Sequence, residues 1–250
     1  MPINYSLNYS RRLTGRTRTQ PANRQLGCML AFIAGAVNAG GFLAVQHYTS
    51  HMTGIVSAMA DQLALGMYSL VLVGFSALVS FLLGATLSTL MVRHSRQRNL
   101  HSEYALPLLV EAGLLLCFGL LGSQISGFNG FYVSATVMLL SFIMGLQNAV
   151  ITKLSNAEIR TTHITGVITD IGIELGKLLC PDANAPDRAR LRLLAMLALC
   201  FFVGGVTGAL GFKHLGYSAT VPLAVTLMAL SIIPIADDLL DYLRQRGRRG

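Results

Sequence analysis

The chain is 250 residues long, carries a formal net charge of +8, and is 53% hydrophobic with only 12% charged residues. Its mean hydropathy of +0.57 is above that of soluble domains of this length, so the composition predicts an all-α integral membrane protein. The basic residues form short clusters beside apolar runs and are not interleaved with aromatic residues. This pattern argues against a nucleic-acid partner and favours the lipid bilayer.

Six apolar runs are each about 18–25 residues long, enough to cross a hydrocarbon core about 30 Å thick. They are continuous and do not alternate in polarity, which argues against a membrane-spanning strand barrel. The sequence therefore predicts six transmembrane helices, at residues 27–45, 67–92, 105–122, 131–151, 193–212 and 217–236. The four cysteines lack CxxC spacing, so we expect neither a disulfide framework, nor a metal site, nor a cofactor.

The distribution of Lys and Arg predicts the orientation, because these residues accumulate in cytoplasmic loops. Residues 1–25 and 237–250 are then basic cytoplasmic tails on either side of a single transmembrane domain at residues 26–236. This assignment places every Lys and Arg except Lys213 on the cytoplasmic side.

Two polar motifs interrupt the apolar segments, at residues 50–54 (Ser-His-Met-Thr-Gly) and 162–166 (Thr-His-Ile-Thr-Gly). Each follows a Gly-x-x-Asn-Ala sequence, beginning at Gly35 or at Gly145. Residues 53–66 are too few for an ordinary span, and residues 165–179 lie between basic loops. We therefore expect two short re-entrant or interfacial half-helices, the first on the outer side and the second on the cytoplasmic side.

An internal repeat is predicted from matches that occur in the same order in the two halves, about 26–122 and 131–236. Besides the two motifs, Phe-x-x-Gly-x-Thr at residues 81–86 matches residues 202–207, and Leu-Pro-Leu at 106–108 matches Val-Pro-Leu at 221–223. Because each half has three crossings, the second half is inverted relative to the first, as in many transporters.

The motif residues predict a polar site. A helix that begins at such a motif directs free N–H groups and a positive dipole end at a solute, with the Thr as N-cap and the His as donor or proton carrier. The alternative is a structural role, in which Thr caps, His and Asn bond between helices, and no solute binds. The residues proposed to bind a solute are Asn38, His51, Thr53, Gly54, Asn148, His163, Thr165 and Gly166.

Three acidic residues are candidates for proton or ion coupling. Glu111 lies within a predicted span, where ionisable residues are functional by default, unless it sits near the interface. Asp170 and Glu174 are spaced i, i+4 on one helix face, so one is expected to be protonated or paired with Arg160 or Lys177. A solvated cytoplasmic face is the alternative for this pair.

The chain from about residue 27 to 236 resembles the DUF1275 or YoaK family of bacterial membrane proteins. The resemblance rests on Asn38-Ala39 followed by residues 50–54, and on residues 145–149 followed by 160–166 and by Thr-Asp-Ile-Gly at 169–172. It implies a protein of the bacterial inner membrane and brings no activity with it. Ile55 stands where the family often has Asn, which removes one further polar ligand from the first motif.

The favoured function is a small-solute permease, channel or proton-coupled exporter, and not an enzyme. A metal-dependent intramembrane enzyme is the first alternative, weakened by the absence of a His-x-x-x-His or His-Glu-x-x-His spacing. A membrane scaffold that transports nothing is the second. Gly-rich faces near residues 204–211 also allow close packing within the chain or in a homo-oligomer.

Overall fold

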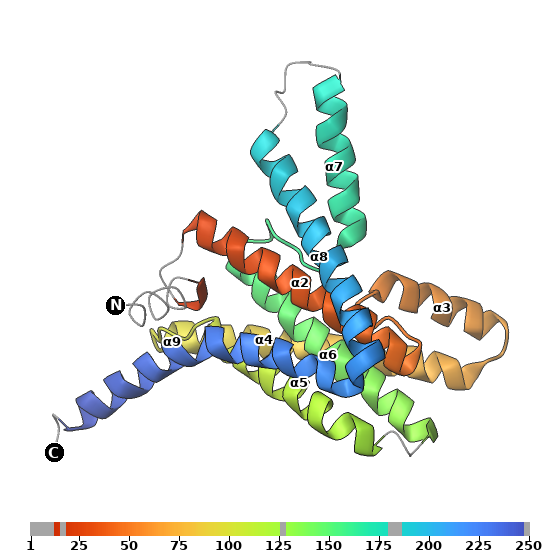
Figure 1. Ribbon diagram of the computed structural model, residues 1–250, viewed down its shortest axis with the longest axis horizontal. Helices are drawn as coiled ribbons and strands as arrows, with labels where there is room; N and C mark the ends of the chain where they lie inside the picture. The colour runs from red at the N-terminus through yellow and green to blue at the C-terminus, as the bar shows by residue number, and fades with distance from the viewer. Residues whose placement is uncertain (1–12, 16–18, 126–128, 180–186, 248–250) are drawn as a thin grey trace.

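The computed structural model describes residues 13–15, 19–125, 129–179 and 187–247, and these contain helices and no strand (Figure 1). The elements are α2 (Gln20–Val45), α3 (Met52–Ala64), α4 (Tyr68–Gln97), α5 (Ala105–Ile125), α6 (Asn129–Leu154), α7 (Ile164–Leu179), α8 (Arg188–Leu215), the 3-10 helix η1 (Gly216–Thr220) and α9 (Val221–Gly247). The predicted all-α class is confirmed. Of the predicted basic tails, residues 13–15, 19–25 and 237–247 are described, and residues 237–247 lie within α9. The cytoplasmic placement of both tails stays a prediction.

Five helical segments in the described ranges are long and apolar enough to cross a membrane, which confirms a multi-pass protein. Four of them correspond to α2, α4, α5 and α6. The fifth is a 57-residue segment from Arg188 to Arg244 that contains α8, η1 and α9. The sequence predicted two spans there, so two of its six apolar runs fall within this fifth segment.

Two helix pairs, α2 with α8 and α4 with α6, form the closest contacts of the bundle. The α2–α8 contact advances in the same direction along both helices, from Gly27 beside Leu197 to Gly40 beside Gly208, so these helices run parallel. Contact between helices in hydrocarbon relies on close packing, because lipid tails are as apolar as Leu side chains. The glycines of these helices allow that packing.

Reciprocal glycine contacts mark the α2–α8 crossing. A Cβ atom on Gly35 would collide with the backbone carbonyl of Phe201. One on Gly204 would collide with the carbonyl of Phe32. Each helix thus presents a Phe-x-x-Gly sequence whose glycine receives the other helix's phenylalanine carbonyl.

The α4–α6 crossing has the same arrangement. A Cβ on Gly84 would meet the carbonyl of Phe142, and a Cβ on Gly145 would meet that of Phe81. The two closest helix contacts therefore use the same Phe-x-x-Gly sequence in the same reciprocal way, although they join different pairs of helices.

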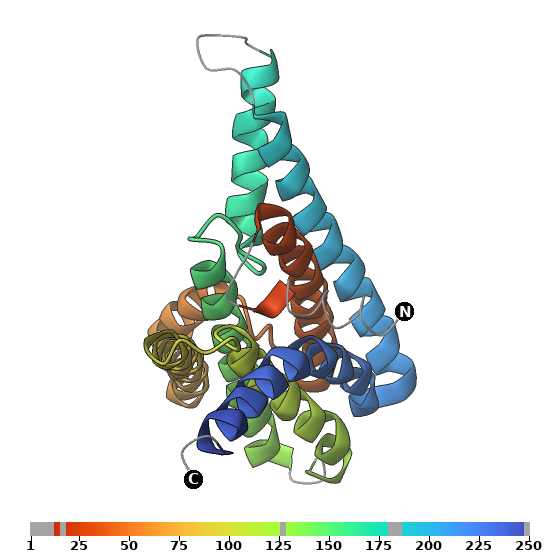
Figure 2. The same ribbon diagram turned by 90° about the vertical axis from the view of Figure 1, so that its left-hand side faces the viewer.

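Two helical hairpins extend from this core. In Figure 1, α3 turns back into α4 on the right, and α7 turns toward the first part of α8 at the top; Figure 2 shows the second hairpin rising from the core in the perpendicular view. No residue of α3 is buried, and its apolar side chains Val56 and Leu63 are exposed. Short helices at the predicted positions 53–66 and 165–179 are confirmed. Their re-entrant or interfacial placement stays a prediction.

Adding a methyl group at the crossings should destabilise the bundle. Gly35→Ala and Gly84→Ala each place a Cβ against a backbone carbonyl, and such overpacking costs about 1–3 kcal/mol. Thermal unfolding of the purified protein in detergent measures the effect. Gly113→Ala on α5 is the matched control, because nothing lies within 4 Å of its Cβ position. Equal stability of all three variants would contradict the crossing geometry.

Candidate functional site

The first motif is held in place by Asn38 of α2. Helix α2 ends at Val45, and Gln46 follows with a left-handed φ of 57°. The side-chain oxygen of Asn38 accepts hydrogen bonds from the hydroxyl group of Ser50 at 2.9 Å and from its backbone N–H at 3.3 Å. Tyr48 stacks on Phe42 with 4.5 Å between ring centroids. The non-helical turn between α2 and α3 is thereby fixed against the end of α2.

The second motif is held by the equivalent residue of α6. The side-chain oxygen of Asn148 accepts a hydrogen bond from the hydroxyl group of Thr162 at 2.7 Å. Its amide nitrogen donates to the carbonyl of Met144 at 2.8 Å. The predicted partners of both asparagines are therefore identified: each bonds the hydroxyl residue immediately before the motif histidine.

The two motifs share a further feature one residue upstream. Thr49 and Thr161 are almost completely buried, at 0% and 1% exposed. Neither hydroxyl oxygen has a hydrogen-bond partner in the described part of the chain. The repeated sequence is thus one residue longer than the five-residue motif, and reads Thr-(Ser/Thr)-His-x-Thr-Gly.

The histidine of each motif lies over the glycine three residues later. A Cβ on Gly54 would overlap the ring of His51, and one on Gly166 would overlap the ring of His163. This explains the invariant spacing of His and Gly between the two copies. Substitution of either glycine would displace the imidazole.

The predicted N-cap role of the motif threonines is wrong. Helix α3 begins at Met52 with His51 at the N-cap position, so Thr53 lies inside the first turn. In α7, Thr165 likewise follows the first helical residue, Ile164, and its carbonyl accepts from Thr169. The first helical hydrogen bonds are from Ile55 N–H to the His51 carbonyl and from Val167 N–H to the His163 carbonyl. The preceding N–H groups of both helices have no helical partner.

A pocket of about 220 Å³ brings the two motifs together. From the first half it is lined by Asn38, Ser50 and His51, and from the second by Thr162, Ile164 and Thr165. Tyr48 and Phe201 complete the wall. The His51 ring makes no hydrogen bond within the described residues and is exposed. We call this the shared pocket.

A second pocket of about 570 Å³ lies beside α7 and contains His163 and Gly166. Three arginines and three acidic residues line it, so we call it the charged pocket: Arg24, Arg160, Arg190, Glu158, Asp170 and Asp187. The two motif histidines therefore face different pockets. The segment 162–166 separates them, with Thr162, Ile164 and Thr165 on the shared pocket and His163 and Gly166 on the charged one.

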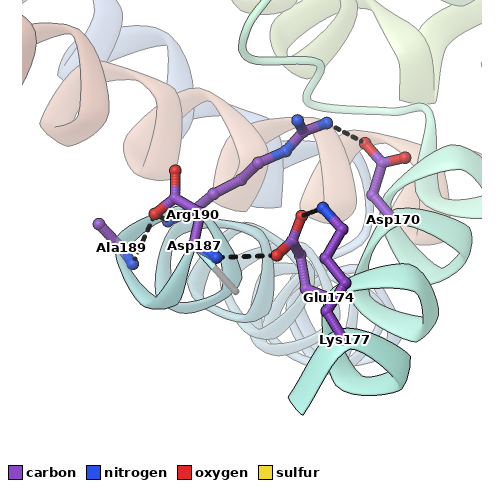
Figure 3. Close-up of polar contacts among 6 residues, drawn as sticks. All are labelled: Asp170, Glu174, Lys177, Asp187, Ala189 and Arg190. Atoms are coloured by element: carbon purple, nitrogen blue, oxygen red, sulfur yellow. Dashed lines mark hydrogen bonds and ion pairs between the residues drawn. The ribbon is translucent and has the colours of Figure 1, made fainter. Parts of the chain in front are cut away.

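Asp170 and Glu174 are both paired with cations (Figure 3). Asp170 accepts from Arg190 of α8 at 3.0 Å, a partner that the sequence did not indicate. The sequence expected one of the two acids to be protonated or paired with Arg160 or Lys177, and the pairing of Glu174 with Lys177 agrees with that expectation. Glu174 accepts from Lys177 at 2.8 Å and from the backbone N–H of Asp187 at 3.0 Å. Asp187 in turn caps α8 by accepting from the N–H groups of Ala189 and Arg190. These contacts join α7 to the start of α8.

The environment of Glu174 keeps its carboxyl group ionised. Hydrogen bonds from Lys177 and from the Asp187 N–H lower the pKa of Glu174 below its ordinary value of 4.5. Each of the two acids at i, i+4 has its own cationic partner, Lys177 for Glu174 and Arg190 for Asp170. In this conformation Glu174 links α7 to the N-cap residue of α8.

Glu111 of α5 is 0% exposed, and neither of its carboxylate oxygens has a hydrogen-bond partner within the described residues. It does not line the shared pocket or the charged pocket. The structure therefore separates it from the motif residues with which the sequence grouped it. Among the described residues there is also no cluster of three His, Cys, Asp or Glu side chains that would hold a metal ion.

The sequence had identified most polar residues of the shared pocket but not all of them. Ser50 and Thr162 bond the two asparagines, and their equivalent positions in the motifs were the available signal. Arg24 and Arg190 of the charged pocket carried no such signal, because both resemble ordinary basic flanks of spans. Thr53 is exposed and lines neither pocket.

Comparison with known proteins gives a family and one curated relative. The model of a family described as "Protein of unknown function (DUF1275)" matches residues 26–233. The chain is also similar to the UPF0700 transmembrane protein YoaK of Bacillus subtilis (strain 168), with 28% identity over 187 residues that cover 73% of this chain and 80% of that protein. No solved structure matches.

The hydrogen bond between Asn148 and Thr162, which we call the second tether, should appear as a coupling between substitutions of the two residues. The equivalent bond between Asn38 and Ser50 is the first tether. Thr162→Val breaks the hydrogen bond between Thr162 and Asn148, and Asn148→Leu breaks that bond and also the bond to the Met144 carbonyl. Because the first bond can be lost only once, the double variant should be no less stable than Asn148→Leu alone. We expect a coupling of about 0.5–1.5 kcal/mol in a double-mutant cycle measured by thermal unfolding. Asn148→Leu combined with Ser50→Ala is the control and should be additive. Additivity of the first pair would contradict the tether.

Acid should loosen the α7–α8 hairpin through Glu174. Because the folded-state pKa of Glu174 is lowered, its carboxylate stabilises the hairpin above pH 4.5, and this contribution is lost as pH falls through the lower folded value. Glu174→Gln should therefore speed amide exchange in α7 at neutral pH, and the difference from the wild type should vanish in acid.

Hydrogen exchange with correction for intrinsic rates measures this difference. Glu158→Gln is the control, because its pair with Arg24 is long, at 3.9 Å, and exposed. A difference between wild type and Glu174→Gln that is the same at both pH values would contradict the assigned role.

Proposed function

The chain is a multi-pass transmembrane protein that belongs to the DUF1275 family, and we propose that it is a small-solute permease or channel whose polar site is the shared pocket. The observation that carries this proposal is the meeting of the two Thr-(Ser/Thr)-His-x-Thr-Gly motifs, from opposite halves of the chain, in one pocket. A motif that only capped a helix would have no reason to meet its copy. Polar residues at membrane depth face protein or water, and here they face a cavity.

The chemistry of the pocket suits an anionic or dipolar solute. The first N–H groups of α3 and α7 have no helical partner, and a helix N-terminus attracts negative charge. His51 adds a ring that makes no hydrogen bond to any described residue and lines the same pocket. The volume of about 220 Å³ is below the roughly 300–1,000 Å³ of sites for drug-sized ligands, so the solute is small.

The second motif also supplies a barrier. Its residues face the shared pocket on one side and the charged pocket on the other. A solute that passes between the two pockets has to cross this short segment, which Asn148 and Thr162 anchor at one end. In the proposed mechanism, displacement of residues 162–166 connects the pockets, and the Asp170–Arg190 pair lines the charged one.

We further propose that the protein crosses the membrane six times as two inverted repeats, with both tails in the cytoplasm of a bacterium. The 57-residue segment at 188–244 would be about 85 Å long as one helix, far more than a single crossing of about 30 Å. The η1 interruption at residues 216–220 supports two crossings within it.

The reciprocal contacts support the same repeat. Each crossing joins the first span of one half to the second span of the other, α2 with α8 and α6 with α4. The reciprocal contacts favour an alignment of the two halves in which Gly84 corresponds to Gly204. The alignment from the sequence matched Gly84 with Gly205, one residue later. Glu111, which lines neither pocket, and Asp170, which lines the charged pocket, remain the candidate proton carriers.

Flux through reconstituted vesicles tests the proposal. Vesicle swelling is followed by light scattering with chloride, formate, urea and glycerol as probes, and protein-containing vesicles should admit at least one probe faster than empty vesicles. His51→Ala should reduce that flux by about tenfold or more, the effect of losing roughly 1.4 kcal/mol of interaction with the solute.

The matched control is His94→Ala, an exposed histidine near the end of α4 that lines neither pocket. Thr162→Trp should also block flux by filling the shared pocket. Flux that survives both His51→Ala and Thr162→Trp unchanged, in well-folded protein, would contradict a pathway through this pocket.

A further inference from the structure

A groove of about 440 Å³ lies between the N-terminal parts of α2 and α8, apart from the shared pocket. It is lined from α2 by Arg24, Gln25, Cys28 and Met29, and from α8 by Ala189, Arg192, Leu193 and Met196. These residues recur at helical spacing, so each helix contributes one continuous face. Figure 1 shows the two helices diverging toward their N-terminal ends.

The groove has a cationic end and an apolar floor. Arg24 and Arg192 are its charged residues, whereas Cys28, Met29, Leu193 and Met196 lie one turn further along their helices or beside it. The polar part of its wall is small, and Met196 is 47% exposed. A ligand that fills it needs one anionic end and one long apolar part.

The two arginines are available to an anion. The Nε atom of Arg24 is buried and has no hydrogen-bond partner in the described part of the chain. Its other contact is the 3.9 Å pair with Glu158, which is too long for a hydrogen bond. Arg192 makes no hydrogen bond or ion pair with any described residue. Guanidinium groups bind phosphate oxygens with two parallel hydrogen bonds.

The position of the groove favours a lipid head group over free phosphate as the anion that binds there. It lies at the ends of α2 and α8 where the arginines gather, and both helices belong to segments that are long and apolar enough to cross a membrane. The outer face of α8 beyond it remains apolar and exposed, at Leu199 and Phe202. Basic pockets between membrane helices recognise lipid head groups in this way.

We propose that this groove is a binding site for an anionic phospholipid, with Arg24 and Arg192 holding the phosphate and Cys28, Met29, Leu193 and Met196 contacting an acyl chain. Because Arg24 also lines the charged pocket, the lipid would lie next to the second motif. The proposal does not depend on transport.

Lipid titration of the purified full chain in neutral detergent tests this site. Native mass spectrometry counts bound phosphatidylglycerol and phosphatidylcholine, and phosphatidylglycerol should bind more tightly. Arg24→Gln and Arg192→Gln should each weaken its binding about fivefold, because one basic residue near a lipid surface contributes roughly that factor. Arg93→Gln, an exposed arginine on α4, is the control for net charge and should bind as the wild type does.

A second kind of variant keeps both arginines and fills the groove with a large side chain. Ala189→Trp should weaken phosphatidylglycerol binding without loss of either arginine. Wild-type binding by both arginine variants and by Ala189→Trp would overturn the site. Equal binding of phosphatidylglycerol and phosphatidylcholine would overturn the proposal, because the site would not distinguish an anionic lipid from a zwitterionic one. Thermal stabilisation by inorganic phosphate that equals that by phosphatidylglycerol would show a free-phosphate site and overturn the lipid.

Discussion

The structure depends on satisfying backbone polar groups where the chain stops being helical. At membrane depth no water is available to an unpaired N–H or carbonyl group, so a turn has to be bonded by protein or line a cavity. Asn38 accepts hydrogen bonds from the backbone N–H and the hydroxyl group of Ser50, and Asn148 accepts one from the hydroxyl group of Thr162, so protein bonds hold both turns. Two interior amides thus allow two polar turns, and the turns create the shared pocket.

Backbone packing brings these turns together. The carbonyl of one helix lies against a glycine of the other at both major crossings, a contact that any side chain would prevent. Asn38 lies one turn after Gly35, and Asn148 one turn after Gly145. Each helix crossing is therefore one turn away from the asparagine that bonds the following motif. The glycines therefore set the distance between helices and also the position of the polar turns. Packing and site are consequences of the same short sequence.

The sequence predicted the helices well because apolar runs of membrane length are long and unambiguous. It also identified both motifs, since a repeated polar sequence is conspicuous in an apolar chain. It failed where the answer depends on three dimensions. The threonine caps were misplaced by two residues, because a histidine at the N-cap position has no strong sequence signal. The Asp170–Arg190 pair was not predicted, because Arg190 approaches only when α8 folds against α7.

The central claim is that the two motifs reach one polar site from opposite faces of the membrane. Labelling of single cysteines by an impermeant reagent tests it directly, with reporters at the exposed positions Thr53 and Leu65 of the first hairpin and Thr165 and Gly176 of the second. We expect the first pair to react only from outside and the second only from inside. Reaction of Thr53 and Leu65 from opposite sides would mean that α3 crosses the membrane fully, and would contradict the account.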